Sequence, residues 1–177
     1  YLSKNAMTDA YIGDCVTSIG DSAFRNCTSL TSCTIGSGVT SIDMSTFNNC
    51  TSLSSIVIPN SVTSIGFEAF RDCTSLTSCT IGSGVTSINS SAFRNCTSLS
   101  SIVIPNSVTR IRDSALRNCS GLTSITVEAT TPPTLSSDYV FDGTNNCPIY
   151  VPSQSVSAYK SATNWSTYAS RIQAIPT

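Results

Sequence analysis

The sequence contains no histidine, and charged residues make up only 11% of its 177 residues. Typical globular chains hold about 25% charged residues. Histidine is the commonest general base and the commonest metal ligand at neutral pH, so the side chain on which most such sites depend is missing. Aspartate and glutamate are few, and none recurs as a pair that would share acid and base roles. We therefore expect no enzyme activity and no cofactor.

Clustered positive charge and long apolar segments are missing as well. Nine Lys and Arg stand against ten Asp and Glu, for a net charge of −1, and no basic patch interrupts the sequence. This balance argues against a nucleic-acid partner and against binding to an anionic membrane surface. No apolar run approaches the roughly 20 residues that a membrane-spanning helix needs, so we expect no direct membrane insertion. No signal peptide opens the chain, which begins at Tyr1 rather than Met, and we expect a mature or trimmed fragment.

What the sequence does contain is a repeat of 23 residues. Five copies of V-T-x-I begin at equally spaced valines, namely Val16, Val39, Val62, Val85 and Val108. Alternate copies resemble each other more closely, which gives a double unit of 46 residues. Self-similarity at a fixed period is the signature of stacked repeat architectures. We therefore predict five 23-residue repeats over residues 16–127.

Each repeat predicts two short extended segments and one turn. The spacing L-x-x-C-x-I, or L-x-x-I-x-I in alternate copies, places apolar residues on one side, as in a short strand. V-T-S-I is a second extended segment, and the S-A-F-R-N-C segment predicts one turn of α- or 3₁₀-helix. One such unit cannot bury its own apolar side, but stacked units can. The pattern predicts a solenoid with parallel strands about 4.8 Å apart along one face.

The columns of this repeat resemble a known family. The segment SLSSIVIPNSVTSIGFEAFRDC, residues 52–73, follows the pattern of the BspA-like, or treponema-type, leucine-rich repeats. The resemblance extends over about residues 16–127. It implies an α/β repeat solenoid, a right-handed leucine-rich-repeat superhelix with short parallel strands and short helical turns. It also implies an extracellular or cell-surface location, since the family is typical of bacterial surface or secreted proteins.

Cysteine recurs with the repeat. One column at period 23 contains Cys27, Cys50, Cys73, Cys96 and Cys119, and a second at period 46 contains Cys33 and Cys79. Zinc sites favour close pairs such as C-x₂-C, whereas this chain offers only C-x₅-C. A nucleophile would need a paired base, and five stacked thiols cannot all form disulfides with one another. We interpret the period-23 column as buried structural cysteines that fill an inner corner. Cys15 and Cys147 are less constrained, and either one could be exposed.

The two ends of the array depart from the pattern. We interpret residues 1–15 as an N-terminal cap or partial repeat, with Ile12 as its isoleucine. Residues 128–152 resemble a degenerate sixth coil with an insertion, because CPIYVPSQSV echoes the earlier SIVIPNSV, and Phe141 falls near the Ala-Phe position. Residues 153–177 predict a C-terminal capping helix.

The capping helix is predicted from a stripe of apolar residues spaced three or four apart: Val156, Tyr159, Ala162, Trp165, Tyr168 and Ile172. Such a stripe is typical of an amphipathic helix. Ser153 or Ser155 would serve as its N-cap. The stripe is interpreted as a lid packed on the last coil; an aromatic ligand platform is the alternative.

Two surfaces are candidates for binding. Alternation along the predicted strands sends two columns outward: Ser32, Thr34, Ser55, Val57, Ser78, Thr80, Ser101, Val103, Ser124 and Thr126. These columns are flat and uncharged and lack the Tyr, Trp and Arg typical of interface hot spots, which favours weak, repetitive contact with a polymer or another solenoid. The second candidate is a stripe of Arg25, Arg71, Arg94 and Arg117, whose alternative reading is a solvated ridge.

The family resemblance implies adhesion, since members are linked to matrix proteins such as fibronectin and to bacterial co-aggregation. We expect a non-catalytic module for adhesion or protein–protein interaction, with a protein or surface polymer as partner. The alternative is a structural spacer that presents another domain. Ice contact is a third reading, but Val57 and Val103 interrupt the threonine array that it would need.

Overall fold

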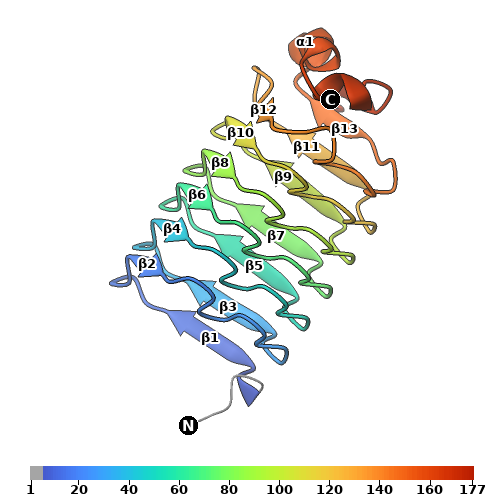
Figure 1. Cartoon of the computed structure of the whole chain (residues 1–177). Coiled ribbons are helices and arrows are strands. Elements are labelled where there is room, and N and C mark those ends of the chain that lie inside the picture. The colour runs from blue at the N-terminus through green and yellow to red at the C-terminus, as the bar shows by residue number, and fades with distance from the viewer. Residues whose placement is uncertain (1–5) are drawn as a thin grey trace.

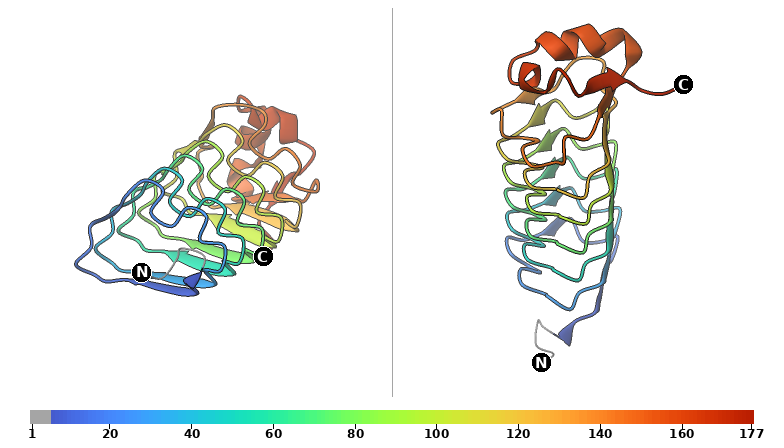
Figure 2. Two further views of the ribbon diagram at one scale, coloured as in Figure 1. Left: turned by 60° about the horizontal axis from the view of Figure 1, so that its bottom comes forward. Right: turned by 90° about the vertical axis from the view of Figure 1, so that its right-hand side faces the viewer.

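The computed structural model describes residues 6–177, so the part of the predicted N-terminal cap before residue 6 lies outside the described residues. The chain winds into about seven coils that stack along one axis (Figure 1). Further views show the coils in near superposition, with the short helices closing the C-terminal end (Figure 2). The predicted solenoid of parallel strands is confirmed.

Each coil up to β12 contributes one longer and one shorter strand, and the last two coils contribute a longer strand only. The longer strands are β1 (Asp9–Ile12), β3 (Ser32–Ile35), β5 (Ser55–Ile58), β7 (Ser78–Ile81), β9 (Ser101–Ile104), β11 (Ser124–Val127), β13 (Ile149–Val151) and β14 (Ile172–Ala174). The shorter strands form a six-stranded sheet of β2 (Ser18–Ile19), β4 (Ser41–Ile42), β6 (Ser64–Ile65), β8 (Ser87–Ile88), β10 (Arg110–Ile111) and β12 (Thr134–Leu135). Paired residues from β2 to β10 lie 23 positions apart, as Ser18, Ser41 and Ser64 do. Each side chain therefore stacks on its equivalent in the next coil.

The interior is a set of apolar ladders. In β3, β5, β7 and β9 exposed and buried residues alternate, so every second side chain enters the core. The rings of Phe24, Phe47, Phe70 and Phe93 stack with centroids 5.2 Å apart and planes within 3–5° of parallel. Close-packed aromatic columns of this kind exclude water from the stack and fix the coil spacing.

The S-A-F-R-N-C segments form consecutive turns, and the predicted helical turn is wrong. Ser22 and Asn26 have positive φ values of 58° and 62°, which interrupts a right-handed helix. Alternate amide groups point to the next coil instead: the N–H groups of Ser22, Phe24 and Asn26 donate to carbonyls of residues 44, 46 and 48. The intervening N–H groups of Ala23, Arg25 and Cys27 bond locally, three residues back, so bonds between coils alternate with single turns and no continuous helix forms.

Two columns of hydroxyl side chains tie the coils together. Thr40 Oγ1 donates to the carbonyl of Thr17 at 3.1 Å, and Thr63 repeats this contact with Thr40 at 3.2 Å. A second column does the same through Thr31, Ser54, Thr77, Ser100 and Thr123. These hydroxyls form hydrogen bonds between coils, which explains much of the high Ser and Thr content.

The wall of longer strands is divided at two places. Within it, β1 pairs with β3, β5 pairs with β7, and the last four strands form one sheet in the order β9, β11, β13, β14. At the end of β11, Glu128 N–H donates to the carbonyl of Ile104 at 3.0 Å. The equivalent residues after β5 and β9 are Pro59 and Pro105, which have no N–H to donate. The two prolines therefore account for the breaks between β3 and β5 and between β7 and β9.

The C-terminal cap consists of several short elements: η2 (Ser153–Ser155), α1 (Val156–Ser161), η3 (Trp165–Tyr168) and β14. A helix is present, as predicted, but it does not run through the whole stripe. Ala162 is extended, with ψ of 148°, and Asn164 is left-handed, with φ of 65°. The stripe still faces the core, with Tyr159, Trp165 and Tyr168 buried. Neither predicted serine makes a side-chain N-cap hydrogen bond.

Candidate functional site

The thiols of the period-23 column lie inside the solenoid. Cys27, Cys50, Cys73, Cys96 and Cys119 are 0–1% exposed. Cys50 Sγ donates to the carbonyl of Phe24 at 3.1 Å, and Cys73 Sγ donates to that of Phe47 at 3.2 Å. Cys96 and Cys119 repeat the contact with Phe70 and Phe93. Each of these four thiols thus closes the turn of the preceding coil.

Burial also suppresses thiol reactivity. It raises the pKa of Cys33, Cys50 and Cys79 to about 12, and it raises the pKa of Cys73 and Cys96 well above the ordinary thiol range. A thiolate, the reactive form, is therefore strongly disfavoured in the folded protein. None of the nine cysteines forms a disulfide bond, and of these Cys15 alone is exposed, whereas Cys147 is buried. Over residues 6–177, no cluster of three or more His, Cys, Asp or Glu is arranged to hold a metal ion.

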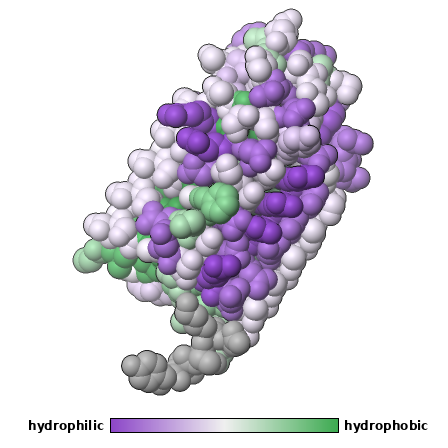
Figure 3. All heavy atoms as spheres, in the orientation of Figure 1, coloured by the Kyte–Doolittle hydropathy of each residue, from purple (hydrophilic) through white to green (hydrophobic). Residues whose placement is uncertain are grey.

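Hydrophilic side chains form a band along one face of the solenoid (Figure 3). Of the four arginines in the predicted stripe, Arg25 is exposed and the others are half-buried. Arg71 forms ion pairs with Glu68 and Asp72, and Arg117 Nε lies 3.2 Å from Asp142 Oδ2. Half of the positive charge of the stripe is therefore paired within the molecule, and Arg25 and Arg94 form no ion pair with any described residue.

The outward side of the longer strands, which we call the strand face, has a different character. Its exposed hydroxyl groups include Thr34, Ser55, Ser78 and Thr80. Unlike the threonines that tie the coils together, these hydroxyls form no hydrogen bond with any other described residue; Ser32 does, donating to Asp9 Oδ1 at 2.5 Å. The strand face therefore carries an ordered array of free donors and acceptors.

Two tyrosines extend this array. Our prediction from the sequence was that the strand-face columns contain no Tyr, Trp or Arg. Tyr11 pairs in register with Thr34, and Tyr150 pairs with Thr126. Tyr11 is 76% exposed, and Val57 between the two ends is 61% exposed. Both tyrosines could have been assigned to the column from the sequence. Tyr11 lies 23 residues before Thr34, and the resemblance of CPIYVP to the earlier SIVIP aligns Tyr150 with Val103.

The two breaks in the wall create hollows on the strand face. One hollow of about 310 Å³ lies between β3 and β5, lined by Ser32, Thr34, Ser55 and Val57 among others. A second of about 360 Å³ lies between β7 and β9, beside Thr80 and Val103. The two strands that face each other across each hollow are not paired in a sheet.

The stacked coils, the parallel strand wall and the inward-facing leucines define a leucine-rich-repeat protein. Residues 2–123 match the family described as the BspA type leucine rich repeat region, in six copies. The chain belongs to this family. A search of curated proteins finds no significant match.

Solved structures with the same fold agree. A leucine-rich repeat protein of Treponema pallidum is 26% identical, with a TM-score of 0.73, over 85% of this chain and 71% of that one. A leucine-rich cell-surface protein of Faecalibacterium prausnitzii is 27% identical, with a TM-score of 0.57, over 85% of this chain and 56% of that one. No helix within residues 6–177 is long and apolar enough to cross a bilayer.

Proposed function

We propose that this protein is a non-catalytic module of a bacterial cell surface that binds another protein through the strand face. The observation that carries the proposal is the column that runs from Tyr11 to Tyr150, in which exposed valines alternate with threonines whose hydroxyls are free. Its seven rungs extend over about 29 Å at the spacing of parallel strands. This length suits an extended segment of a partner protein.

The chemistry of the column supports a protein partner. Exposed valine and tyrosine side chains supply apolar contact area, and tyrosine is typical of interface hot spots. The hydroxyls and the two hollows supply hydrogen-bonding groups at intervals along the same line. The face carries no Lys or Arg, and its one carboxylate, Asp9, lies at the end of the Ser32 column, so binding is expected to change little with salt concentration. The surface location is supported by the name of the Faecalibacterium protein.

A binding assay on immobilised matrix protein, with fibronectin as the first probe, tests this proposal. The variant Val57→Lys with Val103→Lys places two charges in the middle of the column. We expect the wild-type protein to bind and this variant to lose at least tenfold in affinity. The matched control is Met44→Lys with Phe67→Lys, which changes two apolar residues of similar exposure outside the strand face. Equal losses in both variants, or no binding at high micromolar concentration, would contradict the proposal.

The alternative function is a rigid spacer. It is favoured by the two hydroxyl columns, because they are committed to coil-to-coil bonding and offer nothing to a ligand. A spacer predicts that strand-face variants leave every binding property of the full-length protein unchanged. The same pair of variants therefore separates the two functions.

A further inference from the structure

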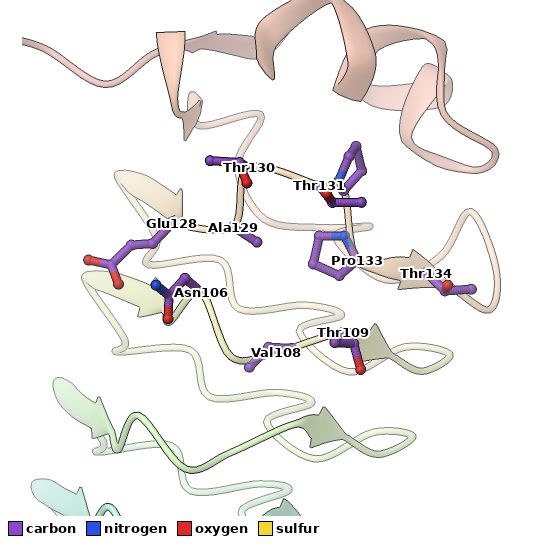
Figure 4. A pocket seen from close by; sticks show the side chains of 10 residues that line it. Asn106, Val108, Thr109, Glu128, Ala129, Thr130, Thr131, Pro133 and Thr134 are labelled. Carbon is purple, nitrogen blue, oxygen red and sulfur yellow. The ribbon is translucent and has the colours of Figure 1, made fainter. Parts of the chain in front are cut away.

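A cleft of about 470 Å³ opens at one edge of the solenoid, beyond the ends of β9 and β11 (Figure 4). Its lower side is the loop of residues 106–109 that connects β9 and β10, and its upper side is the loop of residues 128–134 that connects β11 and β12. Asn106, Thr130 and Pro133 are among its lining residues. The loops at residues 36–38 and 82–84 have a different sequence at this edge, and comparison with them explains the cleft.

Two other coils show how the edge is normally filled. A Gly-Ser-Gly turn sits directly on the preceding coil at residues 36–38 and again at residues 82–84. A Cβ atom on Gly38 would lie 2.0 Å from the carbonyl oxygen of Asp14, and one on Gly84 would lie 2.0 Å from that of Asn60. Only glycine allows such an approach of two backbones.

A hydrogen bond fixes each of these turns in place. The N–H of Ser37 donates to Asp14 Oδ1 at 2.8 Å, and the N–H of Ser83 donates to Asn60 Oδ1 at 2.9 Å. The side chain of Asp or Asn in the lower coil thus accepts a hydrogen bond from the serine N–H of the Gly-Ser-Gly turn above it. This arrangement occurs every 46 residues.

Asn106 is the third residue of this series, but no Gly-Ser-Gly turn lies above it. The next coil has Glu128, Ala129, Thr130 and Thr131 at this place. It also contains one extra residue, because Arg110 pairs with Thr134, which lies 24 residues later instead of the usual 23. The larger side chains and the extra residue keep this loop away from the coil below. Asn106 is exposed, and its side chain forms no hydrogen bond with any residue of the described range.

The cap holds the upper loop in its raised position. Tyr159 Oη donates to the carbonyl of Ala129 and Trp165 Nε1 to that of Pro133, both at 2.7 Å. Ser155 Oγ donates to the carbonyl of Thr130 at 2.7 Å. The donors of all three bonds are buried side chains, so the loop cannot collapse onto Asn106 without breaking them. The cleft is therefore preformed.

We propose that the cleft binds a Gly-Ser-Gly turn of a partner polypeptide, with the serine N–H of the partner donating to Asn106 Oδ1. The chain itself shows twice that this turn fits on an Asx-containing loop of this type. Its own two turns are already seated on Asp14 and Asn60, so the ligand must come from another molecule. The site lies outside the strand face and does not depend on its function.

NMR titration with a peptide copied from this chain tests the proposal. The probe is acetyl-Ile-Gly-Ser-Gly-Val-amide, the sequence of residues 35–39, and the matched control is acetyl-Ile-Ala-Ser-Ala-Val-amide. We expect saturable shifts of the Asn106 side-chain amide and of residues 128–134 with the glycine peptide, and at least tenfold weaker binding of the alanine peptide. Equal binding of both peptides, or no saturable shift with either, would overturn the proposal.

Variants at Asn106 add a second readout. Asn106→Ala removes the acceptor and is expected to weaken the glycine peptide about threefold to tenfold, as for the loss of one hydrogen bond. Asn106→Asp keeps an acceptor oxygen and is expected to retain binding. Both variants should keep the wild-type melting temperature, because the side chain is exposed and unbonded. Unchanged binding by Asn106→Ala would contradict the assigned contact.

Discussion

The thiol of Cys73 donates a hydrogen bond to the backbone carbonyl of Phe47, 26 residues earlier, at 3.2 Å. The ring of the same phenylalanine stacks on that of Phe70 in the next coil. The cysteine column and the phenylalanine ladder are therefore parts of one structure, in which each coil completes the turn of the coil before it. This relationship gives cysteine a structural reason to recur.

The phenylalanine ladder is expected to dominate stability. Phe70→Ala should lower the free energy of unfolding by about 3–5 kcal/mol, because Phe70 is fully buried between two rings. Phe67→Ala, three residues away, is the control and should change it by less than about 1 kcal/mol, since Phe67 is 44% exposed. Urea unfolding measures both values. Similar losses in the two variants would argue against the ladder.

Stability is expected to fall at alkaline pH. Burial raises the pKa of the Cys50 thiol to about 12, whereas the same thiol in the unfolded chain ionises near pH 9. The unfolded state therefore releases its proton first, and stability is complete below pH 9 and declines between pH 9 and 12. The expected slope is about 1.4 kcal/mol per pH unit for each such thiol. Urea unfolding from pH 7 to 11 follows this decline.

Comparison with Cys50→Ala isolates the contribution of one thiol. This variant should be less stable at pH 7 but should lose stability more slowly above pH 9. The exposed Cys15 provides the control, because Cys15→Ser should leave the alkaline slope unchanged. Parallel pH profiles for the wild-type protein and Cys50→Ala would show that the buried thiol does not control alkaline stability.

The cap is expected to depend on the indole of Trp165. Trp165→Phe removes the hydrogen bond to Pro133 and leaves a buried carbonyl unpaired, at a cost of about 1–3 kcal/mol. The melting temperature should fall by about 3–10 °C for a domain of this size. Circular dichroism measures the change, with Tyr139→Phe as an exposed aromatic control. A melting temperature equal to that of the wild-type protein would indicate that this bond is unimportant for the cap.

Much of the fold could be predicted because the 23-residue period forces equivalent residues to stack. The positions of Cys33 and Ile35 in the core follow from that period together with two-residue alternation. The helical turn was predicted wrongly, because local apolar spacing does not reveal that Ser22 and Asn26 adopt positive φ to bond with the next coil. In the cap, local spacing likewise hid the break at Ala162, which turns the chain toward β14.

The candidate sites were harder to predict because they depend on contacts between coils. Sequence alone could not show which hydroxyls form hydrogen bonds between coils. Thr40 donates such a bond and Thr34 does not, although both are threonines of the repeat. Nor could it show that Arg71 and Arg117 are paired with acidic residues. The cleft beside Asn106 results from one inserted residue, whose effect appears only when two coils are compared.

Thiol labelling tests the central claim, that the recurring cysteines are inert parts of the core. The native protein is treated with a thiol reagent, and adducts are counted by intact mass spectrometry over time. We predict one rapid adduct, lost in Cys15→Ser, and nine adducts after denaturation. Rapid addition of several further groups to the folded protein would show that the period-23 thiols are accessible, and would contradict the account.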